Sequence, residues 1–215
     1  MQEKENSWDK EELVVLEKLK TPEKIQLYID SFQYNPYHSF RSPRYVLRER
    51  KAHCSEGAIF AAATLSHLGY PPLILDLKAE NDDDHIIAIY QMNSHYGALA
   101  MSNFATLRLR EPVYRDIREL VMSYFEVYFN TERKKTLREY SETLNLNEFD
   151  HLHWRTTEQD LEIIGDHLDK MPHHKILTPE MISSLSDVSE RLFKISLIGV
   201  NQEGLYDPKK EVKNK

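Results

Sequence analysis

The stretch Lys51-Ala52-His53-Cys54-Ser55-Glu56-Gly57, continued by Ala58-Ile59-Phe60-Ala61-Ala62-Ala63-Thr64-Leu65, decides the fold of this 215-residue chain. Small and apolar residues recur at helical spacing in its second half, and alanine has the highest helix propensity of all residues. Gly69 then stands where a glycine commonly ends a helix. The sequence therefore predicts a buried helix that carries Cys54 in its first turn.

A cysteine at the start of a helix is well placed to act as a nucleophile. The positive end of the helix dipole favours the thiolate, which is the nucleophilic form of the side chain. The unpaired backbone N–H groups of the first turn can also hold an oxyanion. A lone cysteine is otherwise most often a small buried hydrophobic residue, so both interpretations of Cys54 stand at this point.

Three strand-like segments, residues 72–77, 85–90 and 96–103, follow the helix, and polar turns separate them. His85 begins the second segment, and Asn103 ends the third. A helix that begins with cysteine, followed by a sheet that carries histidine and then asparagine or aspartate, is the layout of a Cys-His-Asn/Asp site.

We therefore predict a catalytic site in which Cys54 is the nucleophile and His85 is first the general base and then the general acid. Asn103 is predicted to fix the orientation of the imidazole. Ser102 and Asp76 are the alternatives for this third position.

The same residues carry a family resemblance. Cys54 is followed by Glu56-Gly57-Ala58, the helix exit spans residues 68–72, and His85 precedes a strand that ends in a polar residue. Through this pattern, residues 42–110 resemble the transglutaminase-like superfamily, within the wider group of papain-like folds. The resemblance implies an α+β fold in which the helix bearing the cysteine packs on an antiparallel sheet. It also implies acyl transfer or amide hydrolysis through a thioester.

The sequence departs from the usual family pattern at two places. Ile86 and Ile87 stand where an aromatic residue often follows the histidine, and Asn103 or Ser102 stands where aspartate is usual. Two alternative functions therefore stay open. One is a catalytically silent interaction module that keeps the fold, and the other is a small-molecule amidase or N-acyltransferase.

Additional helices are predicted before and after this core. Ser/Thr-Pro pairs at 21–22, 42–43 and 178–179 each read as an N-cap followed by proline at the first helical position. We expect residues 1–150 to form the α+β domain with its N-terminal helices, and residues 151–215 to form a helical extension packed on the same domain.

The last helix is predicted to run from Thr178 to about Ile198 and to bury one apolar face. A pair of such helices joining two copies of the chain is the alternative, so both a monomer and a homodimer are open. Residues 1–7 and the tail from Asp207 are polar and charged and are predicted to lack regular structure.

Composition bounds the function further. The formal net charge of −7 and the pI near 5.8 argue against a nucleic-acid partner, because no basic stripe dominates. No apolar run suits a membrane span or a signal peptide, so we expect a cytoplasmic protein. A single cysteine excludes an internal disulfide, and a reducing compartment suits a free thiol.

The charged and histidine-rich clusters of the chain do not match known metal sites. The acidic run 80–84 lacks the spacing and the glycine of a calcium-binding loop, so we expect a solvated turn. The histidine pairs at 151/153 and 173/174 lack a third ligand nearby. The sequence therefore predicts no metal and no cofactor. A basic cluster precedes the cysteine and is either a solvated face or a positive field near the thiol. It comprises Arg41, Arg44, Arg48, Arg50 and Lys51. For His53 we expect a structural contact at the helix start rather than a catalytic role.

Overall fold

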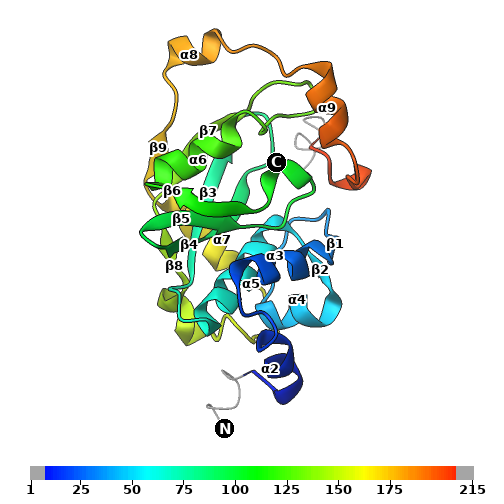
Figure 1. Ribbon diagram of the computed structural model, residues 1–215, viewed down its shortest axis with the longest axis vertical. Coiled ribbons are helices and arrows are strands. Elements are labelled where there is room, and N and C mark those ends of the chain that lie inside the picture. Colours follow the sequence, from blue (N-terminus) through cyan, green and yellow to red (C-terminus); the bar gives the residue numbers. More distant parts are fainter. Residues whose placement is uncertain (1–7, 207–215) are drawn as a thin grey trace.

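The computed structural model describes residues 8–206 (Figure 1), so the predictions for residues 1–7 and for the tail from Asp207 lie outside the described residues. The predicted α+β class is confirmed, since helices pack on an antiparallel sheet. The α-helices are α2 (Lys10–Leu16), α3 (Pro22–Asp30), α4 (Pro43–Glu49), α5 (Cys54–His67), α6 (Ile117–Phe125), α7 (Glu162–Lys170), α8 (Pro179–Ser183) and α9 (Glu190–Ser196).

The main sheet has seven strands in the order β6-β5-β4-β3-β7-β9, and β8 also pairs with β3. Its strands are β3 (Leu73–Ala79), β4 (His85–Met92), β5 (His95–Leu99), β6 (Arg110–Tyr114), β7 (Leu137–Ser141), β8 (Leu144–Asn145) and β9 (His173–Lys175). A separate parallel pair, β1 (Gln33–Tyr34) and β2 (Lys51–Ala52), leads into α5. Three short 3-10 helices, Ala105–Leu107 (η1), Leu146–Leu152 (η2) and Gln202–Gly204 (η3), lie in the connections.

The predicted strands correspond to β3, β4 and β5, although β5 ends at Leu99, before Asn103. Strands β7 and β9 extend the sheet beyond β3. Strands β7 and β8 were not predicted from the sequence, and the histidine pair 173/174 lies in the equally unpredicted β9. These strands are short and rich in polar residues, so they lack the apolar alternation that marks a strand.

The two faces of the sheet support two separate cores, because successive side chains of a strand point to opposite faces. Ile86, Ala88 and Tyr90 of β4 belong to the core that contains α5, whereas Ile87 and Ile89 belong to the core that contains α6. Helices α5 and α6 therefore lie on opposite sides of the sheet (Figure 1). Helix α5 is buried from Cys54 to Leu65, which places the start of this helix inside the molecule.

The C-terminal region differs from its prediction in part. Ile164 and Leu168 of α7 are buried in the core with α5. The single helix expected from Thr178 to about Ile198 is instead the two short helices α8 and α9. Serine and aspartate in the interval 184–189 compete for backbone hydrogen bonds and disfavour a helix interior. Met181 and Ile195, expected on a buried face, are 52% and 51% exposed.

Gly57 makes a testable contribution to the packing of α5. A Cβ atom at this position would lie 2.2 Å from Cβ of Met101, which is too close for any side chain. We expect Gly57→Ala to lower the free energy of unfolding by about 1–3 kcal/mol, measured by urea denaturation, since the helix must move off the sheet. His67→Ala, an exposed change on the same helix, should stay within about 0.5 kcal/mol of the parent. Equal stability of Gly57→Ala and the parent would contradict this close packing.

Candidate active site

The start of α5 is fixed by the buried carboxylate of Glu56. Its Oε2 accepts the backbone N–H of His53 at 2.7 Å, and its Oε1 accepts the hydroxyl of Ser39 at 2.8 Å. The Asn35 amide also donates to Oε2 at 3.3 Å. Because an acid near a helix N-terminus is stabilised by the helix dipole, one side chain holds both the helix start and the loop before it.

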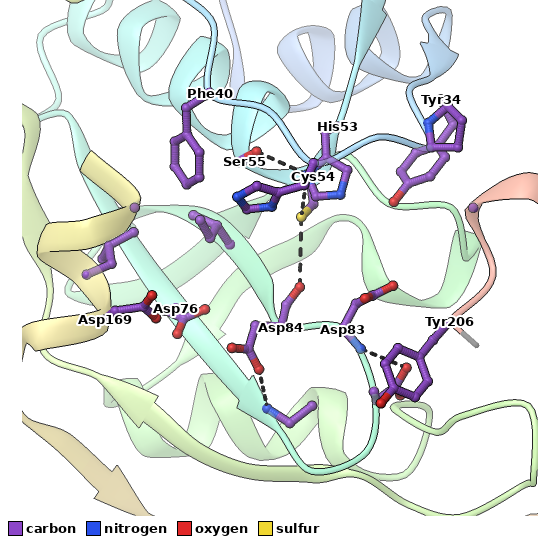
Figure 2. Close-up of a pocket in the computed structure, with 18 of the residues that line it drawn as sticks. Tyr34, Phe40, His53, Cys54, Ser55, Asp76, Asp83, Asp84, Asp169 and Tyr206 are labelled. Carbon is purple, nitrogen blue, oxygen red and sulfur yellow. Dashed lines mark hydrogen bonds between the residues drawn. The ribbon is translucent and has the colours of Figure 1, made fainter. Parts of the chain in front are cut away.

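The thiol of Cys54 contacts an imidazole, but it is that of the preceding residue. The sulfur lies 3.4 Å from Nδ1 of His53 and 3.9 Å from the main-chain oxygen of Asp84 (Figure 2). His53 is the N-cap residue with extended backbone, so its side chain leaves the helix start in a direction that a helical residue does not take. The contacts of the His53 ring at the helix start are thus with the thiol and with the hydroxyl of Ser55.

Hydrogen bonding around His53 indicates which ring nitrogen carries a proton. The Ser55 hydroxyl donates to the main-chain oxygen of Ser39 at 2.6 Å, so it has no second hydrogen to give. Nδ1 of His53, 3.0 Å from that hydroxyl oxygen, must then be the donor. The same N–H lies beside the sulfur and is positioned to stabilise a thiolate. Burial lowers the pKa of His53, while the charge of Glu56 opposes this shift.

His85, the base predicted from the sequence, is buried and engaged on the other face of the sheet. Its backbone pairs with Leu77, and both residues lie on the side of the α6 core. The imidazole Nε2 is 2.9 Å from the main-chain oxygen of Leu107, and the ring makes edge contacts with Tyr124 and Tyr128. Since the carbonyl can only accept, Nε2 is the donor in this hydrogen bond. Within the described chain, no hydrogen bond joins this ring to Cys54.

Asn103 is also engaged away from His85. Its Nδ2 donates to the main-chain oxygens of Asn201 at 2.9 Å and Gly204 at 3.0 Å, and its Oδ1 accepts the N–H of Asn201 at 2.8 Å. The hydroxyl of Ser102 accepts the N–H of Phe104. The carbonyl of Leu107 therefore holds the position on the His85 imidazole that the sequence assigned to Asn103.

The thiol opens into a cavity of about 680 Å³. A smaller cavity of about 40 Å³ shares Cys54 with it and is also lined by His85, Ser102 and Asn103. The three predicted catalytic residues thus line one narrow space, although no hydrogen bonds link them among the described residues.

The large cavity is strongly acidic. Of its described lining residues, seven are carboxylates and none is lysine or arginine. The carboxylates are Asp76, Asp82, Asp83, Asp84, Glu162, Asp169 and Glu203. The basic cluster before Cys54 supplies no described residue to this lining, since Arg44 pairs with Glu12 and Arg50 lies over Tyr28. The idea of a positive field around the thiol is therefore wrong for the cavity.

Three of these acids converge in a group that the sequence did not reveal. Carboxylate oxygens of Asp76, Asp84 and Asp169 all lie within 4.8 Å of one another, and they come from β3, the β3–β4 turn and α7 (Figure 2). Carboxylate oxygens are the ligands that hard divalent cations prefer, so this group has the donor chemistry to hold one. Asp76 and Asp169 are 93 positions apart in the chain. Spacing along the sequence therefore gave no signal for this group.

Burial and the repulsion between neighbouring carboxylates raise the pKa values of Asp76 and Asp84 in this group. Burial, followed by the charge of Asp84, raises the pKa of Asp76 to about 7, and the contact with Nε2 of His173 at 3.4 Å opposes the rise. Burial likewise raises the pKa of Asp84, whose Oδ1 accepts the N–H of Ala79 at 2.7 Å. Asp82 nearby has its pKa raised to about 7 by burial, and the hydroxyl of Thr136 partly offsets this.

Comparison of the sequence with protein-family models and with curated proteins finds no match. In the described residues, no helix combines the length and the apolar character that crossing a membrane requires.

Asp76 predicts a pH-dependent effect on stability. Its pKa is about 7 in the folded protein and about 4 when unfolded, so the folded state binds the proton more tightly and loses stability as pH rises between these values. Asp76→Asn mimics the protonated form. The free energy of unfolding of this variant minus that of the parent should therefore increase from pH 4 to pH 7 and stay level above.

Urea denaturation across this pH range measures the difference. The matched control is Asp166→Asn, an exposed change on α7, for which the difference should vary little with pH. A flat profile for Asp76→Asn would contradict the raised pKa.

Cys54 predicts a small effect of truncation on stability. Its side chain is 6% exposed but borders a cavity, so removal of the sulfur creates little new empty space. We expect Cys54→Ala to change the free energy of unfolding by no more than about 1 kcal/mol. A loss of several kcal/mol in denaturant unfolding would indicate a packed core cysteine instead.

Proposed function

We propose that this protein is a cysteine-nucleophile enzyme that performs acyl transfer or amide hydrolysis through a thioester on Cys54. The observation that carries the proposal is the thiol itself, which stands at the first residue of a buried helix, faces a large cavity and lies 3.4 Å from an imidazole nitrogen. The transglutaminase-like resemblance of residues 42–110 supports the same chemistry, and a papain-like core is part of this proposal.

His53 is the imidazole that we assign to the thiol. The Nδ1–H of His53 faces the sulfur, so loss of the thiol proton to solvent would leave a thiolate that this N–H stabilises. His85 would act as the base only if its ring turned from the α6 side toward the narrow cavity that it shares with Cys54. Asn103, the predicted orienting residue, would then also have to release the backbone of residues 201–204.

The N-terminus of α5 can stabilise the negative charge that develops on the oxygen of the attacked carbonyl group. Among the described residues, the backbone N–H groups of Cys54 and Ser55 have no acceptor, as expected in the first turn of a helix. They are available to an oxyanion formed when the thiolate attacks a carbonyl carbon. Collapse of that intermediate expels the amine or alcohol, which takes up a proton from water, and water or an amine then cleaves the thioester.

The acidic lining of the cavity limits the charge of the substrate that can bind there. Seven carboxylates without a lining lysine or arginine among the described residues disfavour an anionic acyl group and favour a neutral or cationic one. Peptide, protein and small-molecule amides all remain within the proposed substrate class. The catalytically silent module is the second candidate, and the observation that favours it is the engagement of His85 and Asn103 in other hydrogen bonds.

An activated ester tests the proposal directly. Incubation with p-nitrophenyl acetate should release a burst of p-nitrophenolate in proportion to the enzyme, and peptide mapping should find an acetyl group on Cys54. His53→Ala should lower the acylation rate by about 10²-fold or more, the usual cost of removing one hydrogen-bond donor from a developing negative charge. His67→Ala, on the exposed side of the same helix, should leave the rate unchanged.

The variants separate the possible outcomes. Absence of a burst and of an acetyl adduct in the folded parent protein would contradict the enzymatic proposal and favour the silent module. A loss of acylation in His85→Asn, with full activity in His53→Ala, would assign the catalytic imidazole to His85 instead of His53. Circular dichroism must show that each variant is folded, because both histidines are buried or partly buried.

A further inference from the structure

We propose that residues 201–206 form a latch that controls access of large molecules to Cys54, and that Asn103 is the residue that holds the latch closed. The proposal concerns access to the thiol rather than its chemistry. It therefore goes beyond the proposed function and can be tested whether or not Cys54 is catalytic.

Position is the first argument for the latch. Glu203, Gly204, Leu205 and Tyr206 line the 680 Å³ cavity together with Cys54, although they lie some 150 positions later in the chain. Gly204 and Tyr206 also line the smaller cavity that Cys54 shares with His85. Figure 2 shows Tyr206 on a segment that borders the same space as Cys54 and Tyr34. An extended substrate that reaches the thiol from this side would meet the segment.

Asn103 attaches this segment to the core of the protein. The side-chain amide of this residue makes three hydrogen bonds to the backbone of Asn201 and Gly204, and no regular strand pairing adds to them. Asn103 itself is 8% exposed, so its position on the core is fixed. The Asn103 side chain thus holds the segment by hydrogen bonds to backbone groups. The backbone of an approaching peptide can form the same hydrogen bonds with Asn103 and so displace the segment.

Close contact at Gly204 shows how tightly the segment fits. A Cβ atom on Gly204 would lie 2.7 Å from a ring carbon of Tyr34 and 3.1 Å from Nδ2 of Asn103. Tyr34 belongs to β1, which pairs with the strand leading into the helix of Cys54. Any side chain at position 204 must therefore push the segment away from the wall of the cavity.

The chain before the latch is suited to movement. Helix α8 has no buried residue, the buried residue of α9 is Ser196, and Ile198 is 74% exposed. Gly199 has a φ of +77°, a left-handed turn between α9 and the latch. Segments with few buried apolar contacts open at low free energy compared with the core. Opening of residues 201–206 therefore leaves the sheet and α5 intact.

Alkylation of the full-length protein by two reagents tests the latch. Iodoacetamide is small enough to enter a closed cavity, whereas fluorescein maleimide is bulky. We expect Gly204→Val and Asn103→Ala to raise the rate with the maleimide about tenfold or more, while the iodoacetamide rate changes little, because only the bulky reagent depends on the open population. Gln202→Ala is the matched control, since it lies in the same segment and its side chain is exposed.

Each result decides the proposal. Parent-like rates with the maleimide in folded Gly204→Val and Asn103→Ala would overturn it, and so would an equal rise in Gln202→Ala. If one variant does not fold, as judged by circular dichroism, the other decides. Hydrogen exchange of the parent protein gives an independent measurement, in which residues 201–206 must open more readily than α5. Protection equal to that of α5 would also overturn the latch.

Discussion

The buried carboxylate of Glu56 is the interaction on which the arrangement around the thiol depends. It sits three residues into α5 and receives the N–H of His53, the hydroxyl of Ser39 and the amide of Asn35. Loss of this one acceptor would leave several partly buried donors unpaired, each with a desolvation penalty of up to about 1–3 kcal/mol. The extended backbone of His53, and hence the contact of its imidazole with the sulfur, follows from this hydrogen bonding.

Strand β4 explains why the strand could be predicted while the direction of the His85 side chain could not. Residues 85–90 are buried on both faces of the sheet and are almost all apolar, so the sequence shows no alternation that would distinguish one face from the other. Two cores, one on α5 and one on α6, produce this pattern. The strand could be predicted from its composition, but the side-chain direction required knowledge of a second core.

Local signals predicted the helices well where a cap and an apolar face agree. Thr21-Pro22 and Ser42-Pro43 begin α3 and α4 as expected, and the serine or threonine side chain accepts a backbone N–H in each. Thr178-Pro179 begins α8 in the same way, but the helix ends after Ser183. A cap determines where a helix can begin, whereas its length depends on packing, and Met181 finds no core to cover it.

The candidate site was predictable only at its centre. Cys54 could be placed at a helix start because alanine-rich periodicity after it is a local signal. Asp169, Gly204 and the backbone oxygen of Leu107 reach the site through tertiary structure alone, and no spacing rule connects them to position 54. The resemblance to transglutaminase-like proteins described an order of residues along the chain, and that order does not determine which hydrogen bonds the side chains form.

Two electrostatic effects of opposite sign act on a thiolate at Cys54. Seven acidic side chains line the cavity and disfavour a further negative charge, even though burial raises the pKa values of Asp76 and Asp82 to about 7, so a thiolate on Cys54 would have to form within their field. The helix N-terminus and the Nδ1–H of His53 act in the other direction at much shorter range, 3.4 Å from the sulfur in the case of His53. Because charge interactions weaken with distance and with screening by solvent in an open cavity, the short-range donors dominate at the sulfur itself. The carboxylates dominate farther out, where a substrate side chain would lie, so the same site can favour an anion at the thiol and a cation in the cavity.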